Sequence, residues 1–410
     1  MENLKLRNYA KLIVKMGVNV RQGQDVVINA DLDQPKFIAM LVDECYKAGA
    51  SRVDVQWNYQ PLTKIHTRHR TAEELATFYK WELERLEQRA NDLPATIHIV
   101  SEDPDGLKGI AQKKFSKANA MRRQIIKPYR DRMDNKYQWC VAAVPGLQWA
   151  KKLFPDVKTS KLEETLWEYI LKASRADSDP IKQWKKHNAE LKKRCEYLNS
   201  LKIRRLHYSS SNGTSFTVGI PDGARFVGGA EPTLDGTEFN ANIPSEEVFT
   251  SPLRNDVNGK IVASMPLSYQ GELIENFWFE FKDGKVVDYY AEKNPELLES
   301  LLKMDEGSSY LGEVALVPYD SPIRQTGILF YNTLFDENAA CHFALGDSYP
   351  ETLRGFENMS QKELFDHGLN NSIIHVDFMV GTKDLNITAL LDNGEKADIF
   401  KHGNWAEYFI

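Results

Sequence analysis

The sequence has no run of apolar residues long enough to cross a membrane. A membrane-spanning helix needs about 18 to 20 such residues, and every apolar stretch here is shorter or interrupted by charged residues. Residues 1–17 also lack the apolar core of a signal peptide. We therefore expect a cytoplasmic protein with no membrane partner.

Cysteine is scarce and its positions are scattered. The four residues, Cys45, Cys140, Cys195 and Cys341, show no C-x-x-C spacing, which argues against a disulfide framework or a zinc knuckle. Because Cys341 precedes His342, it could serve as a nucleophile or a soft metal ligand. Its small and apolar neighbours favour the alternative, a packed thiol.

An excess of positive charge is also absent. The formal net charge is −6 and acidic and basic residues are interspersed, which argues against a nucleic-acid partner held through phosphate contacts. Local basic clusters such as Lys113 and Lys114 are interpreted as solvated helix faces. His66 and His69 are surrounded by Arg and Lys, which disfavours a bound cation there.

Several motifs that would assign a chemistry are missing. The chain contains neither G-x-G-x-x-G nor G-x-x-x-x-G-K-[ST], so nothing indicates a nucleotide. It also lacks H-E-x-x-H and G-x-S-x-G. A thermolysin-like zinc helix and a serine hydrolase are therefore excluded at the level of motifs.

The first half of the chain alternates strand-like and helix-like segments. Residues 25–30 and 52–56 are rich in β-branched residues and flank a helical pattern over residues 34–48, which indicates a βαβ unit. Residues 95–100 and 137–143 repeat the strand signal. A parallel sheet covered by helices is expected here.

The second half has a different pattern. After a helical zone rich in Lys and Glu, strand signals separated by turn residues dominate; they cover residues 204–208, 215–220, 260–266, 273–281, 285–291, 313–318 and 373–380. Asp283-Gly284 and Asn393-Gly394 predict hairpins. Since 410 residues exceed one ordinary core, we predict an N-terminal α/β domain over residues 1–190 and an antiparallel β-rich domain of the α+β class over residues 191–410.

Five potential metal ligands lie in that second domain. His375 and Asp377 are two residues apart in an apolar run, and alternation along a strand directs both to one face. Glu247, Glu313 and His342 each lie at the edge of an apolar or turn-rich segment. A mixed set of nitrogen and oxygen ligands suits Zn, Co or Mn better than Ca or Mg. Because carboxylates can bridge two ions about 3.5–4 Å apart, a dinuclear centre is the sharper hypothesis.

Each of these residues also has a structural interpretation. A lone His-x-Asp is often a histidine held by its neighbour, and His342 resembles a core histidine. Glu247 could be a turn acid beside Glu246. Glu313 is harder to explain in this way, because burying a carboxylate without a cation is costly.

The segments together resemble the thermophilic-aminopeptidase family of metallopeptidases, the twenty-ninth metallopeptidase family, which includes aminopeptidases T, S and PepS. The resemblance is carried by the opening NYAKLIVKMGVNVRQGQDVVINADLDQ, and by DGTEFNANIPSEEVFTSP, YLGEVALV, NAACHFALGDSYP and NNSIIHVDFMVGT. The order Glu, Glu, His, His-x-Asp and its spacing match the family pattern.

The resemblance implies a homodimer that removes N-terminal amino acids from peptides with a free N-terminus. It implies two divalent ions, Zn, Co or Mn, held by the C-terminal domain. Five residues carry over as ligands, namely Glu247, Glu313, His342, His375 and Asp377. Tyr349 carries over as a catalytic side chain, and the choice of Glu247 over Glu246 rests on the family register.

The mechanism expected from these residues is attack by a water shared between the two ions. Glu313 would also move the proton to the leaving amine, and Tyr349 would stabilise the oxyanion. Two rivals stay open. A phosphoesterase would need a cluster of Arg and Lys near the ligands, and a non-enzymatic binding protein would be expected to have lost a ligand; neither feature is found in the sequence.

Overall fold

The computed structural model describes residues 3–407, which divide into two compact units. The first unit contains the chain up to His187 together with Ala230–Ser245, and the second contains Asn188–Gly229 and the chain from Glu246 onward. Helix α9 (Pro180–Ser200) leads from the first unit into the second. None of the helices within residues 3–407 combines the length and apolar character that crossing a membrane requires.

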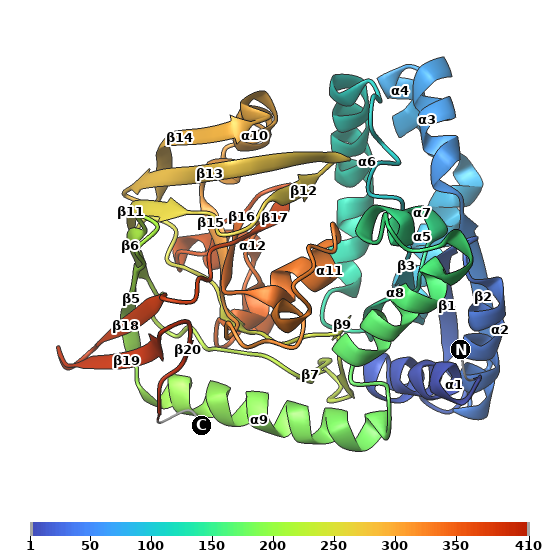
Figure 1. Ribbon diagram of the computed structural model, residues 1–410, viewed down its shortest axis with the longest axis horizontal. Coiled ribbons are helices and arrows are strands. Elements are labelled where there is room, and N and C mark those ends of the chain that lie inside the picture. The colour runs from blue at the N-terminus through green and yellow to red at the C-terminus, as the bar shows by residue number, and fades with distance from the viewer. Residues whose placement is uncertain (1–2, 408–410) are drawn as a thin grey trace. The chain divides into compact units, whose positions relative to one another are not determined.

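A five-stranded parallel sheet with the order β2-β1-β3-β4-β9 forms the centre of the first unit (Figure 1). Its strands are β1 (Asp25–Asp31), β2 (Arg52–Asn58), β3 (Ala95–Val100), β4 (Trp139–Ala143) and β9 (Asn242–Ile243). The helices of this unit are α1 (Asn3–Leu12), α2 (Pro35–Lys47), α3 (Gln60–His69), α4 (Ala72–Ala76), α5 (Lys80–Asp92), α6 (Gln112–Met133), α7 (Leu147–Leu153) and α8 (Thr159–Ala173). The predicted parallel sheet with helices between its strands is confirmed.

Residues 230–245 return to the first unit, although the sequence analysis assigns them to the second domain. Asn242 and Ile243 pair in parallel with Val141 and Ala142 of β4 and add an edge strand to the parallel sheet. A strand of two residues carries no periodic pattern, so sequence periodicity does not predict the return of this segment to the first unit. A single boundary at residue 190 therefore does not account for this segment. Whether residues 1–190 and 191–410 fold as separate domains stays a prediction.

The second unit contains two antiparallel sheets, as expected from its strand signals. The smaller has the order β10-β15-β16-β17, with β10 (Val248–Thr250), β15 (Leu311–Leu316), β16 (His342–Gly346) and β17 (His375–Met379). The larger consists of β5 (Ile203–Ser209), β6 (Ser215–Gly219), β11 (Val257–Val262), β12 (Leu267–Tyr269), β13 (Glu272–Lys282), β14 (Lys285–Lys293), β18 (Asn386–Leu391), β19 (Lys396–Lys401) and β20 (Asn404–Trp405). The short helix α10 (Pro295–Leu302) lies between β14 of the larger sheet and β15 of the smaller one, whereas α11 (Thr333–Asp336) and α12 (Gln361–Asp366) lie between successive strands of the smaller sheet.

An aromatic core joins these two sheets. Phe343 of β16 lies 5.1 Å from Tyr208 of β5 and 5.3 Å from Phe216 of β6, measured between ring centroids. Phe378 of β17 lies 5.1 Å from Phe279 of β13. Burial of such rings contributes about 1.5–3 kcal/mol each, so one face of the small sheet is anchored firmly. The opposite face is free to carry polar groups.

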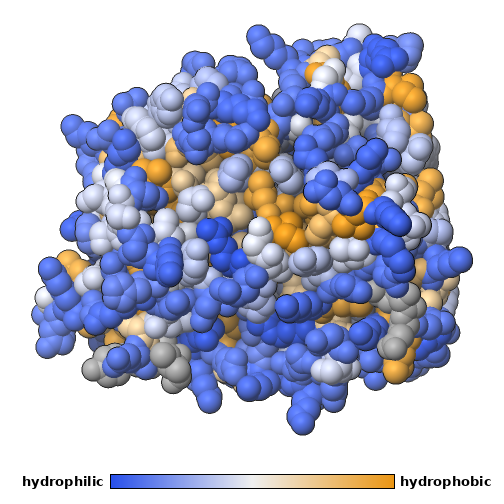
Figure 2. Space-filling model, viewed as in Figure 1, coloured by the Kyte–Doolittle hydropathy of each residue, from blue (hydrophilic) through white to orange (hydrophobic). Residues whose placement is uncertain are grey.

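The face of the molecule drawn in Figure 2 is mainly polar. Hydrophilic residues predominate there and apolar residues are confined to patches. This distribution agrees with the 27 % of charged residues in the sequence.

Candidate metal centre

Neighbouring strands of the small sheet carry the five predicted ligands. Glu247 directly precedes β10, Glu313 lies in β15 and His342 begins β16. His375 and Asp377 lie two residues apart on β17, so their side chains share a face, as the sequence predicts. Segments far apart in the chain thus become neighbours through the strand order.

Strand register explains why a polar pocket can form on this face. Glu313 is opposite Ala344, and Ala344 is opposite Asp377; directly opposed residues of antiparallel strands share a face. The small side chain of Ala344 therefore leaves space between the two carboxylates. The alternate residues Phe343 and Phe378 face the apolar core instead.

The ligand atoms form two overlapping groups. Glu247, Glu313 and His342 each offer one ligand atom, and these atoms lie within 4.8 Å of one another. The same holds for Glu313, His375 and Asp377. Glu313 belongs to both groups, which is the arrangement expected of a carboxylate that bridges two ions.

The choice between Glu246 and Glu247 now has a geometric basis. Oε2 of Glu247 lies 3.2 Å from Nε2 of His342. Within residues 3–407, Glu246 belongs to neither group of ligand atoms; its backbone N–H donates to Oδ1 of Asn338 at 2.7 Å. That bond fixes the segment from which the Glu247 side chain extends.

Both imidazoles are oriented by backbone carbonyls. Nδ1 of His342 lies 3.1 Å from the Ala340 carbonyl oxygen, and Nδ1 of His375 lies 2.9 Å from that of Asp347. Because a carbonyl only accepts, Nδ1 carries the hydrogen in each ring and donates it. Nε2 of each ring therefore faces the carboxylates, which is the orientation of a metal-binding histidine held from behind.

Several polar groups converge on Nε2 of His375. Oε2 of Glu313 lies at 3.0 Å, the hydroxyl oxygen of Tyr349 at 3.2 Å and Oδ1 of Asp377 at 3.3 Å. Two buried carboxylates beside one ring create a strongly negative environment. Such an environment requires compensating positive charge, either protons or cations.

The pKa shifts of these residues also indicate that the carboxylates require compensating positive charge. Burial disfavours the charged form of His342, but its hydrogen bond with Glu247 and the nearby acidic charges outweigh burial and raise its pKa to about 10. Burial likewise opposes protonation of His375, yet the charge of Asp377 raises its pKa well above the usual value. Burial also raises the pKa of Glu313.

Tyr349 lies beside this cluster, as the family resemblance implies. Its ring centroid is 4.7 Å from that of His375, and Phe249 packs against it at 5.4 Å. Burial and the charges of Glu313 and Asp377 raise the pKa of Tyr349 well above its ordinary value. The phenol therefore stays protonated at neutral pH and can donate a hydrogen bond.

Sequence analysis missed one acidic residue of this neighbourhood, Glu337. Partial burial and the charges of Asp377 and Glu247 raise its pKa well above the ordinary range, while His342 opposes the shift. It lies in a 3-10 turn, Glu337–Ala339, where no alternating strand pattern marks a shared face. The one available signal was an acidic residue shortly before His342 in a largely apolar stretch.

Cys341 has no part in the centre. Its side chain is buried in the apolar core, and its thiol donates to the Val317 carbonyl oxygen at 3.2 Å. Burial raises its pKa to about 12, so the thiolate needed for attack or ligation is disfavoured. The interpretation as a packed thiol is correct.

The residues present fit a divalent cation. Two imidazole nitrogens and three carboxylates form a mixed donor set suited to Zn, Co or Mn, and four of these five residues are at least nine-tenths buried. The acids exceed the cationic groups around them, which explains the raised pKa values. Bound cations would compensate the negative charge of the carboxylates in place of protons.

Comparisons with known proteins point in one direction. The model of the thermophilic metalloprotease family matches residues 2–405. Aminopeptidase AmpS of Bacillus subtilis (strain 168) is 42 % identical and aminopeptidase 2 of Geobacillus stearothermophilus 40 % identical, each over 404 residues that cover 98 % of both chains. The structure of wild-type AmpT from Thermus thermophilus matches with a TM-score of 0.90 at 34 % identity, covering 98 % of this chain and 99 % of that one. The resemblance inferred from the motifs is confirmed over nearly the whole chain.

Proposed function

Because this chain belongs to the thermophilic metalloprotease family and is a hydrolase of the metalloaminopeptidase class, we propose that it removes N-terminal amino acids from peptides with a dinuclear metal centre in its second unit. The family implies a divalent metal. We propose Glu247, Glu313, His342, His375 and Asp377 as the ligands, and Zn, Co or Mn as the ions.

The sharing of Glu313 between two groups of ligand atoms is the observation that carries this proposal. A centre for one ion needs about three protein ligands, and the five ionisable groups gathered here, four of them at least nine-tenths buried, exceed that number. Two ions with one bridging carboxylate account for all five. Glu337 supplies a further carboxylate at the edge of the same neighbourhood.

Divalent ions held by Glu247, Glu313, His342, His375 and Asp377 would supply Lewis-acid chemistry: they would polarise the peptide carbonyl and lower the pKa of a bound water toward neutrality. Glu313 takes the proton from the attacking water on a carboxylate oxygen and delivers it to the leaving amine.

Tyr349 stabilises the tetrahedral oxyanion by donating its phenol hydrogen. Donors of this kind contribute about 2.7–4 kcal/mol to transition-state stabilisation. The edge-to-face contact with Phe249 and the contact with His375 hold the phenol in place before substrate arrives. Acidic groups of the centre that do not hold metal bind the free α-amino group of the peptide. A peptide bond far from the N-terminus has no such amine beside it, so only terminal residues are removed.

Two further features are proposed from the family resemblance. We expect the protein to be a cytoplasmic homodimer, with a mass in solution of twice the 46.9 kDa of one chain. Light scattering coupled to size-exclusion chromatography tests the mass. A monomeric mass at working concentration would contradict this part of the proposal.

Hydrolysis of a matched pair of peptides tests the proposed activity. We expect a peptide with a free N-terminus to lose its first residue, and the same peptide with an acetylated N-terminus to stay intact. Treatment with a chelator should abolish cleavage, and Zn, Co or Mn should restore it. A phosphate ester serves as the rival substrate.

Three outcomes would contradict the proposal. Equal cleavage of both peptides would indicate an endopeptidase, and preference for the phosphate ester would indicate a phosphoesterase. Stoichiometric metal with no cleavage of any substrate would indicate a binding protein.

A further inference from the structure

The segment at the end of strand β16, residues 346–349, contacts both ring nitrogens of His375. The carbonyl oxygen of Asp347 accepts a hydrogen bond from Nδ1 of His375 at 2.9 Å, and the hydroxyl oxygen of Tyr349 lies 3.2 Å from Nε2. The position of this segment therefore sets the orientation of the His375 ring and the place of the phenol beside it. A group that fixes the segment acts on the candidate metal centre through His375.

Asn370 fixes this segment on both sides of Asp347. Nδ2 of Asn370 donates to the Gly346 carbonyl oxygen at 2.6 Å. The backbone N–H of Asn370 donates to Oγ of Ser348 at 3.0 Å, and the N–H of Ser348 donates to the Asn370 carbonyl oxygen at 3.1 Å. On the basis of the proposed function, we propose that Asn370 is a positioning residue of the metal centre, which holds the Asp347 carbonyl where it orients His375.

The side-chain amide of Asn370 has only one orientation that satisfies its surroundings. Asn370 is 3 % exposed. Nδ2 also donates to the Gly307 carbonyl oxygen at 2.8 Å, and Oδ1 accepts from Nε of Arg254 at 3.0 Å. The reverse orientation would place the amide oxygen against two carbonyl oxygens, which cannot donate. The amide is therefore a fixed support for the segment 346–349.

Arg254 supports this amide with a buried cation. It is 9 % exposed, and its guanidinium carbon lies 3.7 Å from the ring centroid of Tyr310. Its ion pair with Glu306 is 3.4 Å long, and the Glu306 side chain is largely exposed. A charged donor polarises the amide and strengthens the hydrogen bonds that the amide itself donates. Arg254 and Asn370 thus form a chain of hydrogen bonds that ends on the segment 346–349.

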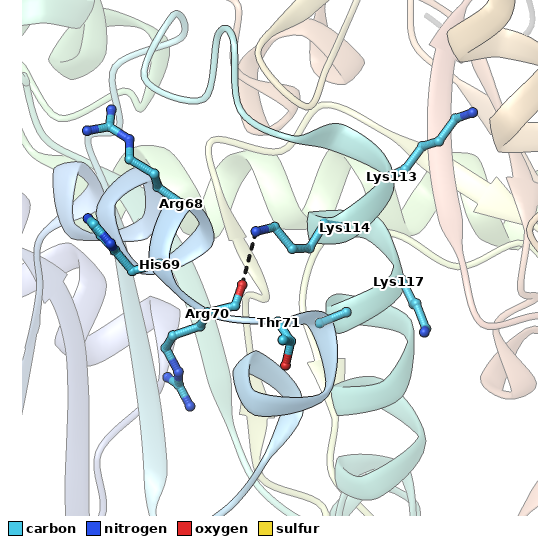
Figure 3. A pocket seen from close by; sticks show the side chains of 8 residues that line it. Arg68, His69, Arg70, Thr71, Lys113, Lys114 and Lys117 are labelled. Carbon is cyan, nitrogen blue, oxygen red and sulfur yellow. Dashed lines mark hydrogen bonds between the residues drawn. The ribbon is translucent and has the colours of Figure 1, made fainter.

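The charged groups of the basic hollow between α3 and α6 do not converge in this way. Nζ of Lys114 donates to the Arg70 carbonyl oxygen at 3.0 Å. The charged ends of four other lining side chains point away from one another (Figure 3), namely those of Arg68, Arg70, Lys113 and Lys117. Lys113 is exposed, as expected for a solvated helix face. In contrast, three hydrogen bonds of Asn370 end on the segment 346–349.

Loss of the Asn370 amide should affect one ion and not the other. His375 belongs to only one of the two groups of ligand atoms. The ring of His342, in the other group, is oriented by a different carbonyl, that of Ala340. Loss of a contact that orients a metal-binding histidine lowers metal affinity about 10–100-fold. We expect Asn370→Ala to weaken one ion by this factor and to leave the other in place.

Stepwise removal of Co²⁺ from the loaded protein by a competing chelator, followed by absorbance, tests the proposal. In Asn370→Ala one ion should leave at a lower chelator concentration, and the first step alone should change. The matched control is Asn199→Ala. Nδ2 of Asn199 donates to the Phe226 carbonyl oxygen at 2.9 Å, and Oδ1 accepts from the Phe226 N–H at 2.7 Å. The control also loses backbone contacts of an amide, but both steps should stay at the wild-type concentration.

A thermodynamic cycle shows whether Asn370 acts through His375. His375→Gln alone should release the same ion, and adding Asn370→Ala to it should not weaken the remaining ion further. If Asn370→Ala does not fold, Ser348→Ala takes its place. It removes only the hydroxyl that accepts from the Asn370 N–H and should weaken the same ion about 2–10-fold, the effect of one hydrogen bond.

Four results would overturn the proposal while the proposed function stands. These are wild-type affinity for both ions in the folded variant, equal weakening of both ions, equal effects of Asn370→Ala and Asn199→Ala, and further weakening in the double variant with His375→Gln. Wild-type protein that holds no metal would overturn the proposed function and this proposal together.

Discussion

Among single residues of the candidate metal centre, Glu313 is the one shared by both groups of potential ligand atoms. It is only 3 % exposed. Replacement by Gln preserves the shape but removes the charge and the proton acceptor. We predict that Glu313→Gln reduces kcat by about 10²–10⁴-fold, the range expected for loss of general acid–base catalysis, while thermal unfolding stays cooperative.

A matched control for this variant is Glu357→Gln, an exposed acid outside the small sheet. It removes the same charge and should leave kcat unchanged. If Glu313→Gln retained substantial activity, Glu313 would have no place in the reaction.

Tyr349 has a separate role that a second variant isolates. We predict that Tyr349→Phe lowers kcat by about 10²–10³-fold with little change in KM, because the lost hydrogen bond acts on the oxyanion and not on the bound substrate. Metal content should stay at the wild-type level. Tyr290→Phe, at a tyrosine that is 51 % exposed on β14, is the control, and equal kcat in both variants would remove Tyr349 from catalysis.

The residues of the site also show which features could be predicted from the sequence and which could not. Strand alternation predicts that His375 and Asp377 share a face, and the structure agrees. No local pattern distinguishes Glu247 from Glu246, because that choice depends on a contact with His342 from a distant segment. Glu337 is not predicted as a member of the site because it lies in a turn, where the direction of side chains follows no simple period.

At the scale of elements, turn residues and β-branched runs were sufficient to identify most strands. The hairpin at Asp283-Gly284 joins β13 to β14 as predicted. The segment of strand β16 is expected only to form short strands and loops, and the strand's bounds are not predicted, because its sequence HFALG is short and contains residues that also suit a helix. Its strand conformation depends on pairing with β15 and β17 on both sides.

The small side chain of Ala344 on β16 leads to a prediction about this strand. Ala344 is fully buried and lies between Glu313 and Asp377 in the strand register. A larger side chain would fill the space between these carboxylates and cost about 1–3 kcal/mol through overpacking. We predict that Ala344→Val folds with reduced stability and binds substoichiometric metal.

Ala389→Val in β18 provides the comparison, because this buried alanine belongs to the apolar core. It should lose stability in a similar way but keep its metal. Full metal occupancy in Ala344→Val would show that the register does not control access to the carboxylates.

For the whole molecule, the raised histidine pKa values predict how stability changes with pH. In the metal-free protein the pKa of His342 is about 10 when folded, against 6.5 for an ordinary histidine. The folded state therefore keeps a proton that the unfolded chain releases. This contribution to stability is complete below pH 6.5 and is lost as the pH rises toward 10, at about 1.4 kcal/mol for each pH unit.

Urea unfolding between pH 6 and pH 9 measures this dependence. Metal-free protein should lose stability as the pH rises, whereas metal-loaded protein should not, because metal replaces the proton. His207→Gln, at a histidine on β5 outside the centre, should behave like the wild type. Metal-free stability that is constant or rises with pH would contradict the charge balance described for the site.

At the same scale, the pairing of Asn242 and Ile243 with β4 could not be predicted from the sequence. Composition and periodicity separate a parallel half from an antiparallel half, but they do not reveal that a later segment returns to an earlier sheet. Long-range pairing of very short strands depends on tertiary contacts alone.

Metal content per chain, measured together with aminopeptidase rate, tests the central claim most directly. We predict two ions per active wild-type chain and a parallel loss of metal and activity in Asp377→Asn and His342→Gln, variants that each alter a different group of ligand atoms. Full activity with one ion per chain, or activity that survives complete removal of metal, would contradict the dinuclear centre.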